Sequence, residues 1–166
     1  MSNPVVKLSA NSIYISTSTI LSDGFHWSLF VTDGNARATR HDWAQSGIIE
    51  KYRCKKIDPT KTYSTNNAVL VYLKVGGCSP PDANKMDEIC RSVFPGGSKP
   101  TVRENREAGM TCRTWLLQVL EVLYEEGFVV RENGIQGIEA KVRKISAENE
   151  QKLAEGDFSI SFVGEV

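Results

Sequence analysis

Two short segments of the chain hold the residues whose chemistry is most informative. His26 lies in a run of aromatic and aliphatic residues, Phe25 to Val31, and Cys112 lies at the start of a strongly helical segment. A thiol that attacks a carbonyl carbon and an imidazole that accepts a proton are the parts of a cysteine nucleophile site. The chain has two histidines, His26 and His41, and four cysteines. The sequence therefore predicts Cys112 as the nucleophile and His26 as its base.

Cys112 differs from the other thiols in its place at a helix start. Thr111 is the predicted N-cap, because its hydroxyl can accept an early backbone N–H. In the first turn the positive end of the helix favours a thiolate, and unpaired N–H groups can stabilise an oxyanion. The alternative is a small buried residue that only seats the helix. The other three thiols look structural or surface-exposed: Cys54, Cys78 and Cys90.

The hairpin between the histidines decides which polar side chain lies beside His26. Asp33-Gly34 predicts a two-residue turn, which places His26 opposite His41 with Cβ atoms about 4.5–5.5 Å apart. A loop of three residues reverses the parity and brings Asp42 opposite His26 instead. We expect His41 to orient the His26 ring, with Asp42 as the alternative.

Four further side chains lie close to these positions in the sequence and are predicted to bind substrate: Trp27, Ser28, Trp43 and Trp115. Tryptophans combine a large apolar surface with an N–H donor, which suits an apolar substrate pocket. Burial in the core is the alternative for all three tryptophans.

The elements that must position these residues indicate an α+β fold, a mainly antiparallel sheet packed against one principal helix. The best helix starts at Thr111, carries an apolar stripe and stops at Gly127. Alternation and apolar runs predict strands over residues 11–18, 26–32, 37–43, 48–57, 68–75, 128–131 and 158–163. Further helices are expected at about 83–94 and from a cap at Ser146 to about Ala154, with a loop at 95–100.

Composition sets the remaining expectations. A chain of 166 residues, 40% hydrophobic and 24% charged, is expected to form a single soluble domain, 1–166. Twenty basic and twenty acidic residues cancel, which disfavours nucleic acid as a partner. The start lacks a signal-like apolar core and no run reaches the ~20 residues of a membrane span, so we expect a cytoplasmic protein.

The cysteine spacing contains no C-x-x-C pair, so we expect reduced thiols, no metal and no cofactor. An alternating basic stripe at Lys51, Arg53 and Lys55 reads as a solvated strand face that could bind an anion.

The pattern His26-Trp27-Ser28-Leu29-Phe30-Val31, a second histidine, and then a cysteine that opens a helix resembles a known family. It is similar to the circularly permuted papain-like (NlpC-like) cysteine fold, especially the lecithin:retinol acyltransferase-like proteins. In that group the histidine strand precedes the cysteine helix. The chain also resembles small fungal proteins without an assigned activity that combine His-Trp-x-Leu-Phe with Cys-x-x-Trp. The family usually has Asn-Cys-Glu-His-Phe around the nucleophile, where this chain has Thr111 to Trp115.

The resemblance implies that Cys112 carries an acyl intermediate, that His26 acts as base and that His41 orients His26. The expected activity is cysteine-dependent acyl transfer from a small ester, amide or thioester to water, or to an amine or alcohol. Addition of the same thiol to an activated alkene stays open. The alternative is a catalytically inactive form of the fold that binds a ligand or protein. The expected partner is a small-molecule substrate or acyl donor, and an edge strand at 158–163 would allow a homodimer.

Overall fold

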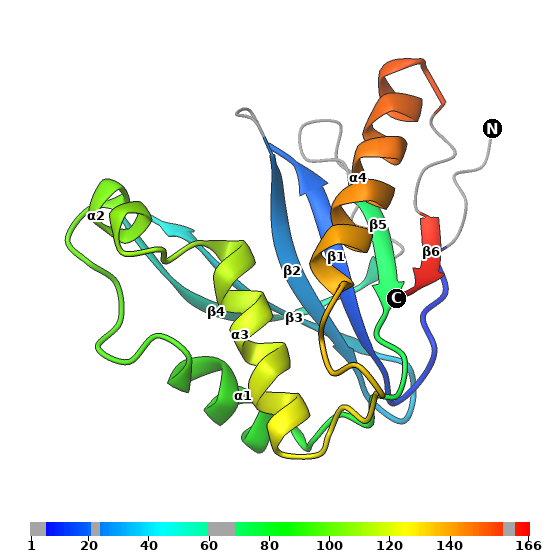
Figure 1. Ribbon diagram of the computed structural model, residues 1–166, viewed down its shortest axis with the longest axis horizontal. Helices are drawn as coiled ribbons and strands as arrows, with labels where there is room; N and C mark the ends of the chain where they lie inside the picture. Colours follow the sequence, from blue (N-terminus) through cyan, green and yellow to red (C-terminus); the bar gives the residue numbers. More distant parts are fainter. Residues whose placement is uncertain (1–5, 21–23, 60–68, 158–161) are drawn as a thin grey trace.

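The computed structural model describes residues 6–20, 24–59, 69–157 and 162–166. The strands in these residues form one six-stranded sheet with the spatial order β4-β3-β2-β1-β5-β6 (Figure 1). Neighbouring strands run antiparallel except β5 and β6, which are parallel. The strands are β1 (Ile13–Thr19), β2 (Phe25–Thr32), β3 (Ala38–Ser46), β4 (Ile49–Ile57), β5 (Val69–Lys74) and β6 (Phe162–Glu165). The predicted α+β class is confirmed, and the sheet is mixed because of its last strand.

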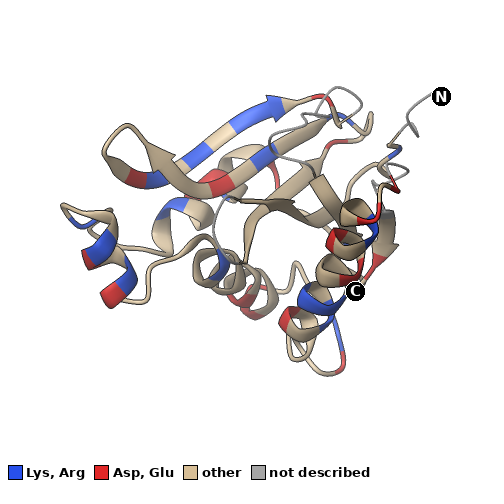
Figure 2. Ribbon diagram, turned by 90° about the horizontal axis from the view of Figure 1, so that it is seen from above, with Lys and Arg blue, Asp and Glu red and all other residues tan. Residues whose placement is uncertain are grey.

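Helices cover one face of this sheet, as the view from above shows (Figure 2). The helices in the described residues are α1 (Ala83–Ser92), α2 (Val102–Glu107), α3 (Cys112–Glu125) and α4 (Ile138–Ala154). α3 packs on β2 and β3, whereas α4 packs on β1 and β5. The prediction of one principal helix is therefore incomplete, since α4 is a second long helix on the same face.

The apolar stripe of α3 forms the centre of the main core. Its five buried members are fully enclosed: Trp115, Leu116, Val119, Leu120 and Leu123. They pack against the odd-numbered residues of β1 and β2, which point to the helix side, including Ile15, Trp27 and Leu29. Burial of a large aliphatic side chain contributes about 1.5–3 kcal/mol, so α3 is held firmly on the strands that carry the histidines.

The opposite face of the sheet is apolar at one end and polar at the other. Val6, Tyr14, Phe30, Ala38 and Tyr72 form a second, smaller core there. Beyond this cluster the face is lined by serine, histidine and arginine side chains. Basic residues, drawn blue, recur along β4 at the edge of the sheet (Figure 2).

The β2–β3 connection is longer than predicted. Residues 33–37 form the loop, and Asp33 organises it because its Oδ1 accepts backbone N–H groups from Asn35 (2.8 Å) and Arg37 (3.0 Å). A short acidic side chain commonly makes such bonds at a turn. The prediction of a two-residue Asp33-Gly34 turn is therefore wrong in length.

The length of this loop sets which side chains share a face. Ser28 pairs with Asp42 and Leu29 pairs with His41. Because side chains alternate along a strand, Asp42 shares a face with Ser28 and His26, while His41 points to the helix side with Leu29. The loop, residues 33–37, contains an odd number of residues. An odd number is what the alternative prediction, with Asp42 beside His26, requires.

β2 and β3 diverge beyond the Ser28–Asp42 pair. β2 continues to Phe25 along β1 only, and β3 continues to Ser46 along β4 only. Alternate residues of a strand direct their backbone groups to the same side. The N–H and C=O groups of Phe25 and Trp27 therefore face a gap where β3 would otherwise lie.

α2 is a helix that the sequence analysis misses. It begins with a capping box, in which the Thr101 hydroxyl accepts the Glu104 N–H and the Glu104 carboxylate accepts the Thr101 N–H at 3.0 Å. Thr-x-x-Glu is a recognised helix-start signal, so the start of this helix could have been predicted from the sequence.

α4 begins earlier than the helix predicted from Ser146. Gly137, with φ of 78°, occupies its N-cap position, and Ser146 lies in its interior with no exposure. The Ser146 Oγ lies 2.6 Å from Thr17 Oγ1 on β1. The predicted cap is therefore wrong, because this hydroxyl joins the helix to the sheet.

Two predicted strands also change. Residues 128–131 contribute only an isolated bridge between Val129 and Cys78. The last strand is β6, and the first four residues of the predicted range, 158–161, lie outside the described residues.

The segments that follow β5 and α3 approach each other very closely. Gly77 has φ of 72°, and a Cβ built there would lie 2.1 Å from the Val130 carbonyl oxygen. The Val130 N–H donates to the Gly77 carbonyl at 2.8 Å. Only glycine fits this conformation and this distance. The end of α3 is thereby fixed to the end of β5.

The Thr17–Ser146 contact allows a test of how α4 is attached. Thr17→Val and Ser146→Ala should each lower the free energy of unfolding by about 1–2 kcal/mol. Each substitution leaves the other buried hydroxyl without its hydrogen-bond partner. The double variant should lose less than the sum, since the two groups satisfy each other. Urea unfolding of the four proteins measures this. Strictly additive losses would contradict a direct hydrogen bond.

Candidate active site

His26 and Asp42 form an ion pair on the face of the sheet away from the helices. The His26 Nε2 lies 2.9 Å from Asp42 Oδ2. The Asp42 side chain is only 1% exposed and also accepts hydrogen bonds of 3.0 Å and 2.7 Å from the Arg53 guanidinium. Arg40 Nε lies 3.7 Å from the same carboxylate. The structure thus brings Asp42, rather than His41, to the His26 ring.

The start of α3 reaches β2 at the gap that β3 leaves. Thr111 is the N-cap, and its hydroxyl accepts the Thr114 N–H at 3.1 Å. Cys112 is the first helical residue, and its Sγ lies 3.9 Å from the Phe25 carbonyl oxygen. The Trp27 backbone N–H donates to the same sulfur. The cysteine therefore uses the backbone groups that would otherwise bond to a neighbouring strand.

The Cys112 sulfur and the His26 ring lie close enough for each to shift the pKa of the other. Because Asp42 holds Nε2, Nδ1 is the ring nitrogen left for the sulfur. The thiol, the imidazole and the carboxylate stand in the order of a nucleophile, a base and an orienting acid, with the imidazole and the carboxylate 2.9 Å apart.

The pKa values of the pair shift in opposite directions. Burial alone would lower the pKa of His26, but the hydrogen bonds to Asp42 and Cys112 outweigh it and raise that pKa to about 9. Burial would raise the pKa of Cys112, but the His26 hydrogen bond and charge, together with the Trp27 N–H, lower it. Burial also opposes ionisation of Asp42, yet His26 and Arg53 bring its pKa down to about 2. The site favours a thiolate beside an imidazolium.

Arg106 is a contributor that the sequence analysis misses. It lies on α2, forms two hydrogen bonds of 3.0 Å with the buried Glu50 carboxylate, and its charge adds to the lowering of the Cys112 pKa. Its guanidinium also donates to the Met110 carbonyl at 2.9 Å, just before α3. Because α2 was not predicted, nothing in the sequence analysis placed the Arg106 side chain near the Cys112 thiol.

A cavity of about 430 Å³ lies beside the His26–Asp42 pair. Its polar lining residues carry hydroxyl, amide and guanidinium groups: Ser16, Ser18, Thr19, Ser28, Gln45, Arg40 and Arg53. Ser28, one of the predicted substrate-binding residues, belongs to this lining.

The other predicted site residues lie elsewhere. His41 is buried on the helix side of the sheet and hydrogen-bonds to Tyr52 through Nδ1 at 2.7 Å. Trp27, Trp43 and Trp115 belong to the main core, each at most 4% exposed, and none lines the cavity beside His26. These tryptophans share strands or helices with the site residues but point to the core face.

Cys54, Cys78, Cys90 and Cys112 all have free thiols. Burial raises the pKa values of Cys78 and Cys90 to about 12, which makes them poor nucleophiles. Cys54 is exposed on β4 beside His41. Within the described residues, Cys112 is the cysteine whose pKa is lowered by both a neighbouring imidazole and a backbone N–H.

Within the described residues, no three His, Cys, Asp or Glu side chains are grouped so as to hold a metal ion. None of the helices in the same part of the chain is long and apolar enough to span a membrane. In comparisons with known proteins, no family model, curated protein or solved structure matches this chain.

The ion pair predicts a distinct reactivity of Cys112. In the Cys54→Ser background at pH 6.5, iodoacetamide should alkylate Cys112 several-fold faster than a thiol of ordinary pKa, because the lowered pKa increases the thiolate fraction. Asp42→Asn should slow the reaction several-fold, because His26 loses the carboxylate that keeps it protonated. Peptide mass spectrometry measures both rates.

Glu88→Gln is the control, since Glu88 is an exposed carboxylate of α1. It should leave the alkylation rate unchanged. Equal rates for the wild type and Asp42→Asn across pH 6–8 would contradict the ion pair.

His41 predicts a separate dependence of stability on pH. Burial lowers its pKa from 6.5 to about 4, so between these values the unfolded chain binds a proton that the folded chain does not. The contribution of His41 to the free energy of unfolding should therefore be highest above pH 6.5 and fall by up to about 3 kcal/mol as the pH drops to 4. His26 does not contribute in this window, because its contribution, from a pKa raised to about 9, is complete below pH 6.5.

Urea unfolding of the wild type and His41→Gln between pH 4.5 and 7.5 checks this. The variant should show a shallower loss of stability on acidification. Parallel curves for the two proteins would show that His41 is not the group responsible.

Proposed function

We propose that this protein is a cysteine-dependent acyl-transfer enzyme, with Cys112 as nucleophile, His26 as acid–base group and Asp42 as the orienting residue. One observation carries the proposal. The His26 ring lies between the Asp42 carboxylate at 2.9 Å and the Cys112 sulfur, with the pKa values of the thiol and the ring shifted in opposite directions. Perturbed titration in a partly buried pair is frequent at catalytic sites.

In the first half-reaction the Cys112 thiolate attacks the carbonyl carbon of an ester, amide or thioester. A carbon–sulfur bond forms and the carbonyl electrons move to oxygen. When the tetrahedral intermediate collapses, the leaving group takes the proton of the His26 imidazolium. Asp42 keeps the ring oriented through Nε2, so that the other nitrogen faces the sulfur and the leaving group.

The start of α3 supplies donors for the oxyanion. Thr111 caps the N–H of Thr114, whereas the N–H groups of Cys112 and Arg113 form no hydrogen bond with described residues. Both belong to the first turn of a helix, where the helix dipole adds positive potential. Such fixed donors are effective because they need no reorganisation during the reaction.

In the second half-reaction neutral His26 takes a proton from water, an amine or an alcohol as that acceptor attacks the thioester. The carbon–sulfur bond breaks and the Cys112 thiolate returns beside an imidazolium. Water gives hydrolysis, and the other acceptors give acyl transfer. The polar cavity beside His26, with its serines and two arginines, suits a small and partly polar acyl donor or acceptor.

A permuted papain-like fold is part of the proposal. The histidine strand precedes the cysteine helix in the chain, and the helix start packs against that strand, as the resemblance implies. An aspartate on the strand next to the histidine takes the orienting position that His41 was expected to hold.

The proposal predicts an acyl-enzyme on Cys112. With 4-nitrophenyl acetate and butyrate, the wild type should release 4-nitrophenol in a burst and carry a hydroxylamine-sensitive acyl group on Cys112. Cys112→Ser should lose the adduct, and His26→Ala should slow acylation about 10²- to 10⁴-fold, as expected for loss of a general acid–base group. Stopped-flow absorbance and intact-protein mass spectrometry measure these steps.

Cys54→Ser is the control, because Cys54 is an exposed thiol on β4, away from His26 and Asp42. It should leave the burst intact. An adduct that forms equally fast on Cys112→Ser, or that maps to Cys54, would falsify the assignment.

A binding role without catalysis is the second candidate. It is favoured by a cavity of about 940 Å³ on the other side of the sheet, and by the finding that Cys112 lines neither this cavity nor the one beside His26. Absence of any acyl adduct, together with ordinary alkylation of Cys112, would favour this role over the enzyme.

A further inference from the structure

His41 is a buried titratable group that the proposed reaction does not use. Its Nδ1 lies 2.7 Å from the Tyr52 hydroxyl, and that hydroxyl donates to Asp87 Oδ1 at 3.0 Å. Tyr52 has only one proton to donate, and a carboxylate only accepts. Both contacts are hydrogen bonds at once only if His41 donates from Nδ1. The network therefore selects the Nδ1–H tautomer.

The other ring nitrogen is then an uncharged acceptor. Burial keeps the pKa of His41 near 4, so the ring is neutral at pH 7 and Nε2 carries a lone pair. Nε2 forms no hydrogen bond with described residues. The ring cannot turn easily to satisfy it, because it stacks on Tyr52 at 6.0 Å between centroids and 6° between planes, and Tyr52 stacks in turn on Trp115.

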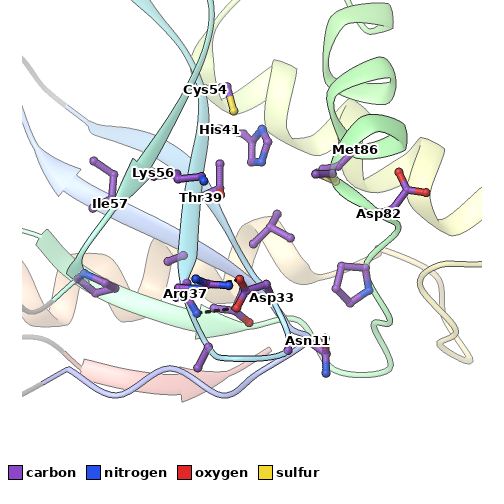
Figure 3. Close-up of a pocket in the computed structure, with 18 of the residues that line it drawn as sticks. Asn11, Asp33, Arg37, Thr39, His41, Cys54, Lys56, Ile57, Asp82 and Met86 are labelled. Carbon is purple, nitrogen blue, oxygen red and sulfur yellow. Dashed lines mark hydrogen bonds and ion pairs between the residues drawn. The ribbon is translucent and has the colours of Figure 1, made fainter.

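His41 lines a cleft of about 940 Å³ between the sheet and the start of α1 (Figure 3). Figure 3 shows the ring projecting from β3 toward α1 and Met86. Much of the lining is apolar, including Val31, Ile57, Pro80 and Met86. A roomy apolar cleft with a few fixed polar groups is the usual form of a small-molecule site.

The charges around the cleft are of both signs and are largely engaged. Arg37 and Asp33 pair with each other at 3.0 Å, and the Asp82 carboxylate caps α1 by accepting the Lys85 N–H at 2.9 Å. Lys56 is exposed at the side of the cleft. The neutral imidazole of His41 is thus a buried polar group with an unused acceptor position beside the cleft, which suits an uncharged donor, whereas Lys56 lies at the exposed side.

This cleft is separate from the Cys112 site. Val31, in its wall, lies four residues along β2 from Trp27, whose N–H contacts the Cys112 sulfur. At about 3.3 Å per residue this is roughly 13 Å along the strand. The cleft also opens on the helix side, whereas the cavity beside His26 lies on the other face of the sheet.

We propose that the cleft binds a neutral aromatic molecule of one or two rings that bears a hydroxyl or N–H group, with that group donating a hydrogen bond to Nε2 of His41 and the rings lying against the apolar wall. This is a second binding site, independent of the acyl-transfer chemistry.

The test uses the full-length protein with three probes that share one ring system: 2-naphthol, 2-methoxynaphthalene, which lacks the donor, and 2-naphthoate, which is anionic. Saturation-transfer NMR and isothermal titration measure their binding up to about 1 mM, a range suited to weak ligands. 2-Naphthol should bind about five- to tenfold more tightly than the other two, the ratio expected for one buried hydrogen bond.

Imidazole nitrogen NMR provides a readout that does not depend on affinity. His41 should show a protonated Nδ1 and a pyridine-type Nε2, and 2-naphthol, but not the methyl ether, should shift the Nε2 signal. His41→Gln should reduce the affinity for 2-naphthol to that of the methyl ether. Tyr52→Phe should reduce the preference for 2-naphthol over the methyl ether, because the Tyr52 hydroxyl no longer fixes the Nδ1–H tautomer of His41. Tyr124→Phe is the matched control, since Tyr124 is a partly exposed tyrosine on α3.

Cys112→Ser should leave 2-naphthol binding unchanged, so failure of the acyl-transfer proposal and failure of this one are distinguishable. The proposal is overturned by tighter binding of 2-naphthoate, by equal binding of 2-naphthol and its methyl ether, by no saturable binding, or by an unchanged Nε2 signal.

Discussion

The divergence of β2 and β3 beyond Ser28 and Asp42 is the constraint on which the candidate active site depends. A continuous ladder would bury the backbone groups of Phe25 and Trp27 in strand pairing. Because β3 turns away with β4, these groups face a gap, and a buried backbone group without a partner is costly. The first turn of α3 fills the gap, and the Cys112 sulfur takes the place of the missing strand. The position of the thiol is thus a consequence of how the sheet satisfies its backbone.

The same divergence divides the two histidines between the two faces of the sheet. His26 lies where the strands separate, next to Asp42, and two arginines compensate the buried carboxylate. With a single partner, the desolvation cost of the buried carboxylate would be offset less completely. His41 lies where the strands still pair, and its environment keeps it neutral. One hairpin therefore carries a charged imidazole on one face and an uncharged one on the other.

Much of this arrangement could be predicted from the sequence. The length of the β2–β3 loop, odd or even, could not. The apolar runs located β2, β5 and α3, and Thr111 marked Cys112 as the thiol at a helix start. The pairing of His26 with Asp42 depends on whether the hairpin loop has an odd or even length. Asp33-Gly34 suggested a tight turn, whereas the Asp33 carboxylate organises a longer loop by binding two backbone N–H groups. Arg106 lay further from prediction, since its approach to Cys112 depends on tertiary packing of a six-residue helix.

α3 acts as a spacer of fixed length between two anchored ends. Its start is held by the strand gap at Cys112, and its end is followed directly by the close crossing of Gly77 and Val130, where no side chain fits. One residue inserted in the helix would turn its start by about 100° and move it by about 1.5 Å relative to its end. Neither anchor can absorb that change. The geometry of the two anchors therefore constrains the number of residues between the thiol and the crossing, independently of which side chains those residues carry.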